Sequence, residues 1–238
     1  MLVTCYYDLY GTPDGFQKYL DLFKPLGLSG IPIVLFIDSV HANHFSMFPF
    51  TVKVIEMPLK EFELYQIAMR YDRDLPSTRN EAKDTKEFFA LMNTKVECIK
   101  KAAEAFPFVT QWMWIDFGIL KVVTYTERFI TKLKELQSRP FTKMAFPGCW
   151  GFGRPFTVES INWRFCGGFF VMPTVHIERF YQHSKNVLTD FCTNSIYKLT
   201  WETNVWNLVE YFAEKDNINW YIADHNDTIV TNIDLIQS

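Results

Sequence analysis

The sequence has no cysteine pair at Cys-x-x-Cys spacing, no long apolar run and no excess of basic residues. Its five cysteines, Cys5, Cys98, Cys149, Cys166 and Cys192, are scattered and odd in number. That pattern argues against a zinc site and a disulfide framework and favours a reducing compartment. The net charge of −3 argues against a general nucleic-acid binder, which needs a strong basic excess. Any phosphate that binds here must therefore meet local groups or a metal.

The chain also lacks the features that would place it across a membrane. It has no run of about 18 apolar residues, and residues 1–8 lack the basic region of a secretory signal. No internal repeat or low-complexity segment is visible. We therefore expect a soluble, cytoplasmic protein. With 238 residues and 48% hydrophobic content, the chain is long and apolar enough for one large globular domain.

Short apolar runs alternate with helical patterns along the chain. Strands are predicted at residues 2–7, 31–37, 52–57 and 220–223 and around Trp112, and helices at 16–26, 85–105, 125–137, 175–192 and 201–213. Residues 60–84 predict a helix followed by an exposed loop, and residues 141–156, rich in glycine, proline and aromatics, predict a loop. The alternation predicts an α/β fold with a mixed, mostly parallel sheet and helices on both faces.

Aromatic residues are abundant, at 17% of the chain, with 23 Phe and 7 Trp. Such residues bury large apolar surfaces, so many of these rings are expected to fill the core. Aromatic rings also stack against sugars and bases. Some of them could therefore line a binding groove, and the two interpretations are compatible.

Asp116 closes a short apolar run, Trp-Met-Trp-Ile, and is followed closely by Gly118. A buried strand can carry the apolar residues into a core, but an unpaired carboxylate is costly to bury. We therefore expect Asp116 where the strand emerges, with Gly118 allowing a sharp turn. Ligands and metals are usually held at the carboxyl ends of strands in α/β sheets.

Three further features could carry chemistry: the pair Gly167-Gly168, Glu202, and His225 within Asp-His-Asn-Asp at 224–227. Each alone has a structural interpretation, as a tight turn, a solvated helix face or an Asx turn. Together with Asp116 they form a coherent set. Asp116 and His225 offer a minimal Mg²⁺ or Mn²⁺ site, and Glu202 offers a general base or a group that stabilises positive charge on a sugar ring. The two glycines allow a ligand to approach the backbone.

Three segments follow one another in a particular order. They are Trp-Ile-Asp-Phe-Gly at 114–118, Trp-Arg-Phe-Cys-Gly-Gly-Phe-Phe at 163–170 and Leu-Thr-Trp-Glu-Thr-Asn at 199–204. This order resembles GT-A-type nucleotide-sugar glycosyltransferases. It looks closest to a little-characterised bacterial and large-virus branch, in which a Trp-Ile-Asp-x-Gly element replaces the usual Asp-x-Asp motif. The resemblance implies a single Rossmann-like GT-A domain over residues 1–238, with a nucleotide-binding half at about 1–120 and an acceptor-side half at about 121–238.

The resemblance also implies roles for individual residues. Donor-binding residues would be Tyr6, Tyr7, Asp8 and Asp38 near the base and ribose, Lys95 facing the nucleotide-sugar, Asp116 on the diphosphate, and Gly167, Gly168 and Phe169 between donor sugar and acceptor. Asp116 and His225 would bind Mn²⁺ or Mg²⁺, and Glu202 would be the catalytic carboxylate. The substrates would be a nucleotide-sugar, such as a UDP-sugar, and a glycan or glycoprotein acceptor.

One departure from the family pattern matters. Trp114 stands two residues before Asp116, where many relatives have a second acid, which leaves open a metal-independent enzyme that uses Lys or Arg instead. The alternative is a non-catalytic glycan- or nucleotide-binding protein on the same fold, although pure binding needs no carboxylate at a reacting centre. A metal-dependent hydrolase or nucleotidyltransferase would usually have more clustered acids or a Gly-rich basic loop. The sequence leaves the stereochemical outcome of transfer open.

Overall fold

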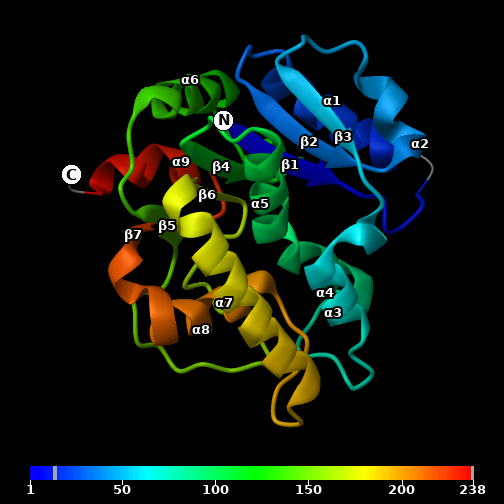
Figure 1. The fold of residues 1–238 in the computed structure, drawn as a ribbon, viewed down its shortest axis with the longest axis vertical. Helices are drawn as coiled ribbons and strands as arrows, with labels where there is room; N and C mark the ends of the chain where they lie inside the picture. Colours follow the sequence, from blue (N-terminus) through cyan, green and yellow to red (C-terminus); the bar gives the residue numbers. More distant parts are fainter. Residues whose placement is uncertain (13–14, 237–238) are drawn as a thin grey trace.

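The computed structural model describes residues 1–12 and 15–236, and Figure 1 shows the arrangement of its elements. Its helices and strands are β1 (Leu2–Tyr6), α1 (Gly15–Gly27), β2 (Ile33–Ile37), α2 (Ser39–Ala42), β3 (Val52–Glu56), α3 (Glu63–Met69), α4 (Lys86–Asn93), α5 (Lys95–Ala105), β4 (Gln111–Ile115), α6 (Thr126–Ser138), β5 (Met144–Gly148), β6 (Phe169–Pro173), α7 (Thr174–Thr193), α8 (Glu202–Val209), β7 (Ile218–Ile222) and α9 (Thr228–Thr231). None of the described helices is long and apolar enough to cross a membrane.

Within the described residues, seven strands form one sheet in the order β3-β2-β1-β4-β6-β5-β7. Strand β1 pairs in parallel with β2 and β4, whereas β6 runs antiparallel to β4 and β5. The prediction of a mixed, mostly parallel sheet is confirmed. From β1, successive strands are added toward one edge of the sheet as far as β3, and from β4 onward they are added toward the other edge. The order of strands therefore reverses between the neighbours β1 and β4. In open α/β sheets, ligands bind at such a switch point, outside the carboxyl ends of the strands.

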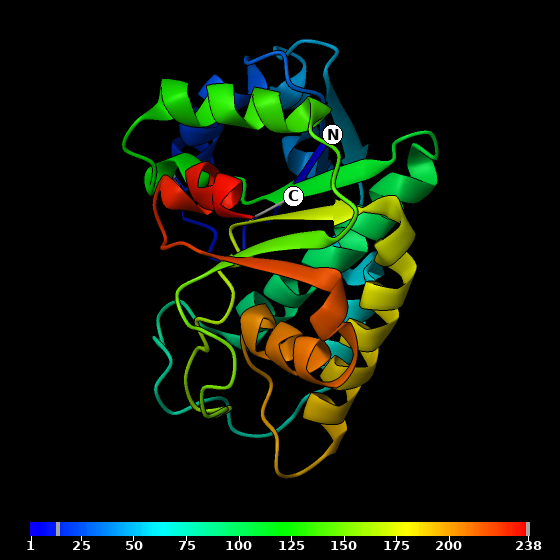
Figure 2. The same ribbon diagram turned by 90° about the vertical axis from the view of Figure 1, so that its left-hand side faces the viewer.

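Helices cover both faces of this sheet, as predicted. The side chains of each strand alternate between the two faces, so both faces are apolar and need cover. Trp112 and Trp114 of β4 belong to a core shared with α5 and α7, while Met113 and Ile115 belong to a second core shared with α1 and α6. In Figure 2 the sheet lies between the green helix α6 and the orange helix α8. The strand ends are therefore the part of the sheet that helices leave accessible.

Strand β5 was predicted as part of a loop, and that prediction was wrong. Its Pro147 and Gly148 are residue types that strands disfavour. All five residues of β5 are nevertheless buried and pair in parallel with β7, so tertiary packing overrides the local preference. A methyl group on Gly148 would lie 1.9 Å from the carbonyl oxygen of Arg164, so glycine is required where the segment before β6 crosses the end of β5.

The helix predicted at 85–105 is two helices, α4 and α5, which meet at Thr94. The Asn93 amide donates to the carbonyl of Thr200 at 3.0 Å, and Thr94 Oγ1 donates to a carbonyl in the last turn of α4 at 2.7 Å. Such side-chain bonds compete with the helical hydrogen-bond ladder. The break makes Lys95 the first residue of α5. Because side chains tilt toward a helix N-terminus, its ammonium group reaches the strand ends.

Candidate active site

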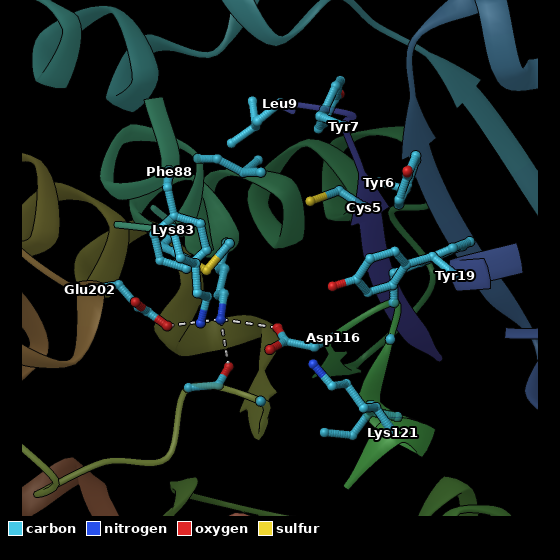
Figure 3. A pocket seen from close by; sticks show the side chains of 18 of the residues that line it. Cys5, Tyr6, Tyr7, Leu9, Tyr19, Lys83, Phe88, Asp116, Lys121 and Glu202 are labelled. Atoms are coloured by element: carbon cyan, nitrogen blue, oxygen red, sulfur yellow. Dashed lines mark hydrogen bonds and ion pairs between the residues drawn. The ribbon is translucent and has the colours of Figure 1, made fainter. Parts of the chain in front are cut away.

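A cavity of about 440 Å³ lies at the carboxyl ends of β1 and β4, a size that suits a small-molecule ligand. Figure 3 shows many of the side chains that line it. Its walls include residues 5–12 at the end of β1, parts of α1 and α4, the start of α5, residues 116–122 after β4, the pair Gly167-Gly168 before β6, and the start of α8 with His225. The cavity thus occupies the switch point of the sheet.

The Lys95 ammonium group joins the parts of this site. Its Nζ lies 2.8 Å from Glu202 Oε1, 3.0 Å from Asp116 Oδ1 and 2.9 Å from the Gly167 carbonyl oxygen. An ammonium group has three N–H donors, so these three acceptors satisfy it fully. The side chains of Lys95 and Glu202 are only 2% and 6% exposed, whereas that of Asp116 is 38% exposed. Lys95 therefore holds one buried and one accessible carboxylate in place.

The charge on Lys95 depends on these partners. Burial disfavours its ammonium form, but attraction and hydrogen bonds from Asp116 and Glu202 outweigh that cost, so its pKa is raised above the usual value. Lys95 is thus positively charged at neutral pH. With three occupied donors, however, it has none left for a ligand. Lys95 lines the cavity, and that it faces a nucleotide-sugar there stays a prediction.

Trp114, which replaces a second acid in the motif, orients Asp116. Its indole Nε1 donates to Asp116 Oδ1 at 2.8 Å, the same oxygen that Lys95 contacts. The other oxygen, Oδ2, remains available to the cavity. In the sequence, Trp114 stands out only as the absence of a second acidic metal ligand. Strand alternation could have revealed its role, because residues two apart point to the same side of a strand.

The diglycine accommodates the two carboxylates. A methyl group on Gly167 would lie 2.1 Å from Glu202 Oε1 and 3.2 Å from Lys95 Nζ. A methyl group on Gly168 would lie 3.0 Å from the Ile119 side chain and 3.7 Å from Asp116 Oδ2. Gly167 is therefore required for the position of the Glu202 carboxylate, and Gly168 leaves room beside Asp116.

His225 follows β7 and lines the same cavity. Its ring packs edge-on against Trp163, with the ring centroids 4.9 Å apart. Burial lowers the pKa of His225 below its usual value, and this effect outweighs the negative charge of Asp116, which acts to raise that pKa. The imidazole is therefore neutral at neutral pH and has a ring nitrogen that can accept a hydrogen bond or bind a metal.

The predicted metal would need ligands among these side chains. Among the residues that the structure describes, no group of three or more His, Cys, Asp or Glu side chains could hold a metal ion. Asp116 offers one oxygen and His225 one nitrogen, and the Lys95 ammonium already neutralises Asp116 at 3.0 Å. A divalent ion at Asp116 would meet the repulsion of that ammonium group. The protein side chains alone do not fit a dedicated metal site, and we derive no step through a metal.

The first strand brings Tyr6, Tyr7 and Asp8 to the other end of the cavity. Tyr7 donates its hydroxyl to the Met57 carbonyl at 2.8 Å, and Asp8 Oδ1 accepts from the backbone N–H groups two and three residues later. Burial raises the pKa of Tyr6 to about 12. These residues build the wall, and Asp8 Oδ2 is left for a polar group of a ligand.

Two predicted site residues lie elsewhere. Asp38 follows β2 at the start of α2 and is not among the residues that line the cavity. Phe169 begins β6 and pairs with Ile115; its fully buried side chain packs in the core shared with α1 and α6. Phe169 points away from the cavity because a strand presents only every second residue to one face.

The structure also places residues at the cavity that the sequence analysis missed. Tyr19 of α1 lies so close to Gly118 that a methyl group there would be 2.6 Å from the tyrosine ring. Lys83, before α4, and Lys121, in the short turn Ile119–Lys121 after β4, line opposite sides of the cavity in Figure 3. The position of Lys121, five residues after Asp116, was the one available signal in the sequence.

The chain was compared with known proteins. No protein-family model and no curated protein sequence matches it. The solved mannosyltransferase Ktr4p from S. cerevisiae is similar with a TM-score of 0.51 and 10% identity, over 92% of this chain and 67% of that one. A glycosyltransferase involved in the glycosylation of the major capsid of PBCV-1 gives a TM-score of 0.46, 14% identity and coverage of 94% and 80%.

A third solved structure, a 4-diphosphocytidyl-2C-methyl-D-erythritol synthase from Anaerococcus prevotii, gives a TM-score of 0.45, 9% identity and coverage of 99% and 94%. At such low identities the likeness shows the fold alone. Together with the seven-stranded sheet of the described residues, the likeness to Ktr4p confirms the predicted GT-A-like, Rossmann-like α/β fold. Function has to be argued from the site itself.

Proposed function

We propose that this protein is a glycosyltransferase, which moves a sugar from a nucleotide diphosphate sugar to a hydroxyl group of a glycan or glycoprotein. The observation that carries the proposal is the Lys95 ammonium group between Asp116 and Glu202, at the switch point of the sheet. It fixes two carboxylates in different surroundings in one cavity. One carboxylate is buried and the other is accessible, and two carboxylates in such different environments can take different roles in one reaction.

In the proposed reaction, the bond between the sugar C1 atom and the donor diphosphate breaks, and a bond from C1 to the acceptor oxygen forms. The nucleoside diphosphate leaves, and the acceptor hydroxyl loses its proton. Glu202, buried beside Gly167, would act on the sugar and acceptor. It would remove that proton if the configuration inverts, or stabilise or bond to C1 if the configuration is retained. Asp116 would orient the donor at the diphosphate end.

The nucleotide would lie toward the end of β1. Tyr6, Tyr7 and Asp8 wall that end of the cavity, and Tyr19 adds a further ring. Aromatic rings and one free carboxylate oxygen are suited to a base and a ribose hydroxyl. The predicted Mn²⁺ or Mg²⁺ stays a prediction. Asp116 and His225 are its predicted ligands, and no step of the proposed reaction depends on it.

Replacing Glu202 with glutamine should separate catalysis from binding. We expect turnover to fall by about 10²–10⁴-fold, the usual contribution of a general acid or base, while donor affinity changes little. The measurement is release of nucleoside diphosphate from a panel of nucleotide-sugars, with glycan acceptors, in the presence of Mn²⁺ and of EDTA. Unchanged turnover would remove Glu202 from the reaction. If wild-type protein binds glycans but turns over no donor, the non-catalytic alternative is favoured.

A further inference from the structure

Two lysines line the cavity without a carboxylate partner among residues 1–12 and 15–236. The lysines that do form ion pairs there are Lys24, Lys95, Lys100, Lys101, Lys132, Lys185 and Lys198. Lys83 and Lys121 are exposed and belong to different walls of the cavity. Figure 3 shows Lys121 pointing into the cavity from the side of β4. Unpaired cations that face a cavity indicate an anionic ligand.

The backbone holds both lysines in place. Tyr10, after β1, donates its hydroxyl to the Lys83 carbonyl at 2.7 Å, and Lys83 Nζ lies 4.8 Å from the centre of the Phe88 ring. Lys121 ends the turn that follows Asp116, where its N–H donates to the Gly118 carbonyl at 3.0 Å. The Lys83 and Lys121 ammonium groups thus come from anchored segments on the two sides of the cavity.

Lys95 cannot supply the positive charge that a diphosphate needs. Its three donors are occupied by Gly167, Glu202 and Asp116, and its charge is opposed by two carboxylates. A diphosphate beside Asp116 would be repelled by the free Oδ2 oxygen unless another cation lay between them. The cavity therefore needs a second source of positive charge, and the chain's net charge of −3 provides none at long range.

We propose that Lys83 and Lys121 bind the donor diphosphate from opposite sides, so that donor binding needs no divalent metal. This inference rests on the proposed function, since it assigns how the donor of that reaction is held. Lysine ammonium groups bind phosphate as flexible point charges, and two of them offset most of the charge of a nucleoside diphosphate. Asp116 and Trp114 then orient the ligand, and Lys95 holds the carboxylates.

Inorganic pyrophosphate is a suitable probe, because it tests the diphosphate contacts whatever the nucleotide. We expect calorimetric titration to show pyrophosphate binding to wild-type protein in EDTA. Lys83→Gln and Lys121→Gln should each weaken it about tenfold, the usual cost of losing one hydrogen bond to a charged group. Lys134→Gln is the matched control, because Lys134 is exposed on α6 and does not line the cavity; its affinity should equal that of the wild type.

Two outcomes would overturn the inference: no pyrophosphate binding in EDTA, or binding that the Lys83 and Lys121 substitutions leave unchanged. Circular dichroism of each variant checks that the fold is intact. The proposed function can fail separately. Sugar transfer that requires Mn²⁺ and is insensitive to Lys121→Gln would refute only the lysine contacts. Lysine-dependent pyrophosphate binding without turnover of any nucleotide-sugar would refute only the transferase.

Discussion

Lys95→Met is expected to lower the free energy of unfolding by about 3–5 kcal/mol, the typical cost of leaving one partner of a buried ion pair alone. The reason is that Glu202, 6% exposed, would keep its charge without the ammonium group 2.8 Å away. In a domain of this size, such a loss lowers Tm by roughly 10 °C. Turnover should fall by about 100-fold or more, because both carboxylates lose the group that positions them. Urea denaturation and donor turnover are the two measurements.

The double variant Lys95→Met/Glu202→Gln provides the control. It removes the uncompensated carboxylate, so most of the lost stability should return while turnover stays low. Residues that contact each other give non-additive changes in double-mutant cycles. If the stability losses of the two single variants simply added, the contact between Lys95 and Glu202 would not contribute as the structure indicates.

Gly167→Ala is expected to reduce turnover by about 100-fold, the effect of moving a reacting group by about 1 Å. The added methyl group would lie 2.1 Å from Glu202 Oε1, so the carboxylate or the backbone has to move. Because the Gly167 carbonyl also accepts from Lys95 at 2.9 Å, any shift of the backbone disturbs the ammonium group as well. The measurement is turnover of the donor that the wild type uses.

Two other glycines make the comparison specific. A methyl group on Gly151 meets no atom within 4 Å, so Gly151→Ala should behave as wild type. A methyl group on Gly168 meets the end of the Ile119 side chain at 3.0 Å, which can move, so Gly168→Ala should have an intermediate effect. Equal activity of the Gly167 and Gly151 variants would show that Glu202 does not need its present position.

The sequence predicted the fold well where the hydrophobic period and the residue composition of a segment indicate the same kind of element. The strands at β1, β2 and β4 are apolar runs that end at an acid or an aromatic pair, and their alternation with helices predicts the α/β class of the fold. Strand β5 was missed because Pro147 and Gly148 oppose strand formation locally, and its pairing partner β7 lies some 70 residues away in the chain. The break at Thr94 was missed because it depends on a contact with Thr200.

For the candidate site, the sequence predicted which residues take part but not how they are arranged. Asp116, Glu202 and the diglycine could be selected as unusual residue types in apolar segments, and the structure brings them to one cavity. That Lys95 lies between them could not be predicted, since it requires the distance between two helix starts. Lys83 and Lys121 were missed because a sequence does not show which lysines are paired, although Lys121 lies only five residues after Asp116.

The claim that this cavity binds a nucleotide-sugar is tested most directly by thermal stability. We propose to compare wild-type protein and Asp116→Ala with a panel of nucleoside diphosphates and their sugars, with Mn²⁺ and with EDTA. A ligand at 100 times its Kd stabilises the folded state by about 2.7 kcal/mol. We predict that at least one nucleotide-sugar raises the wild-type Tm and that Asp116→Ala, whose side chain is 38% exposed, folds but does not respond. No rise with any ligand, or the same rise in Asp116→Ala, would contradict the account.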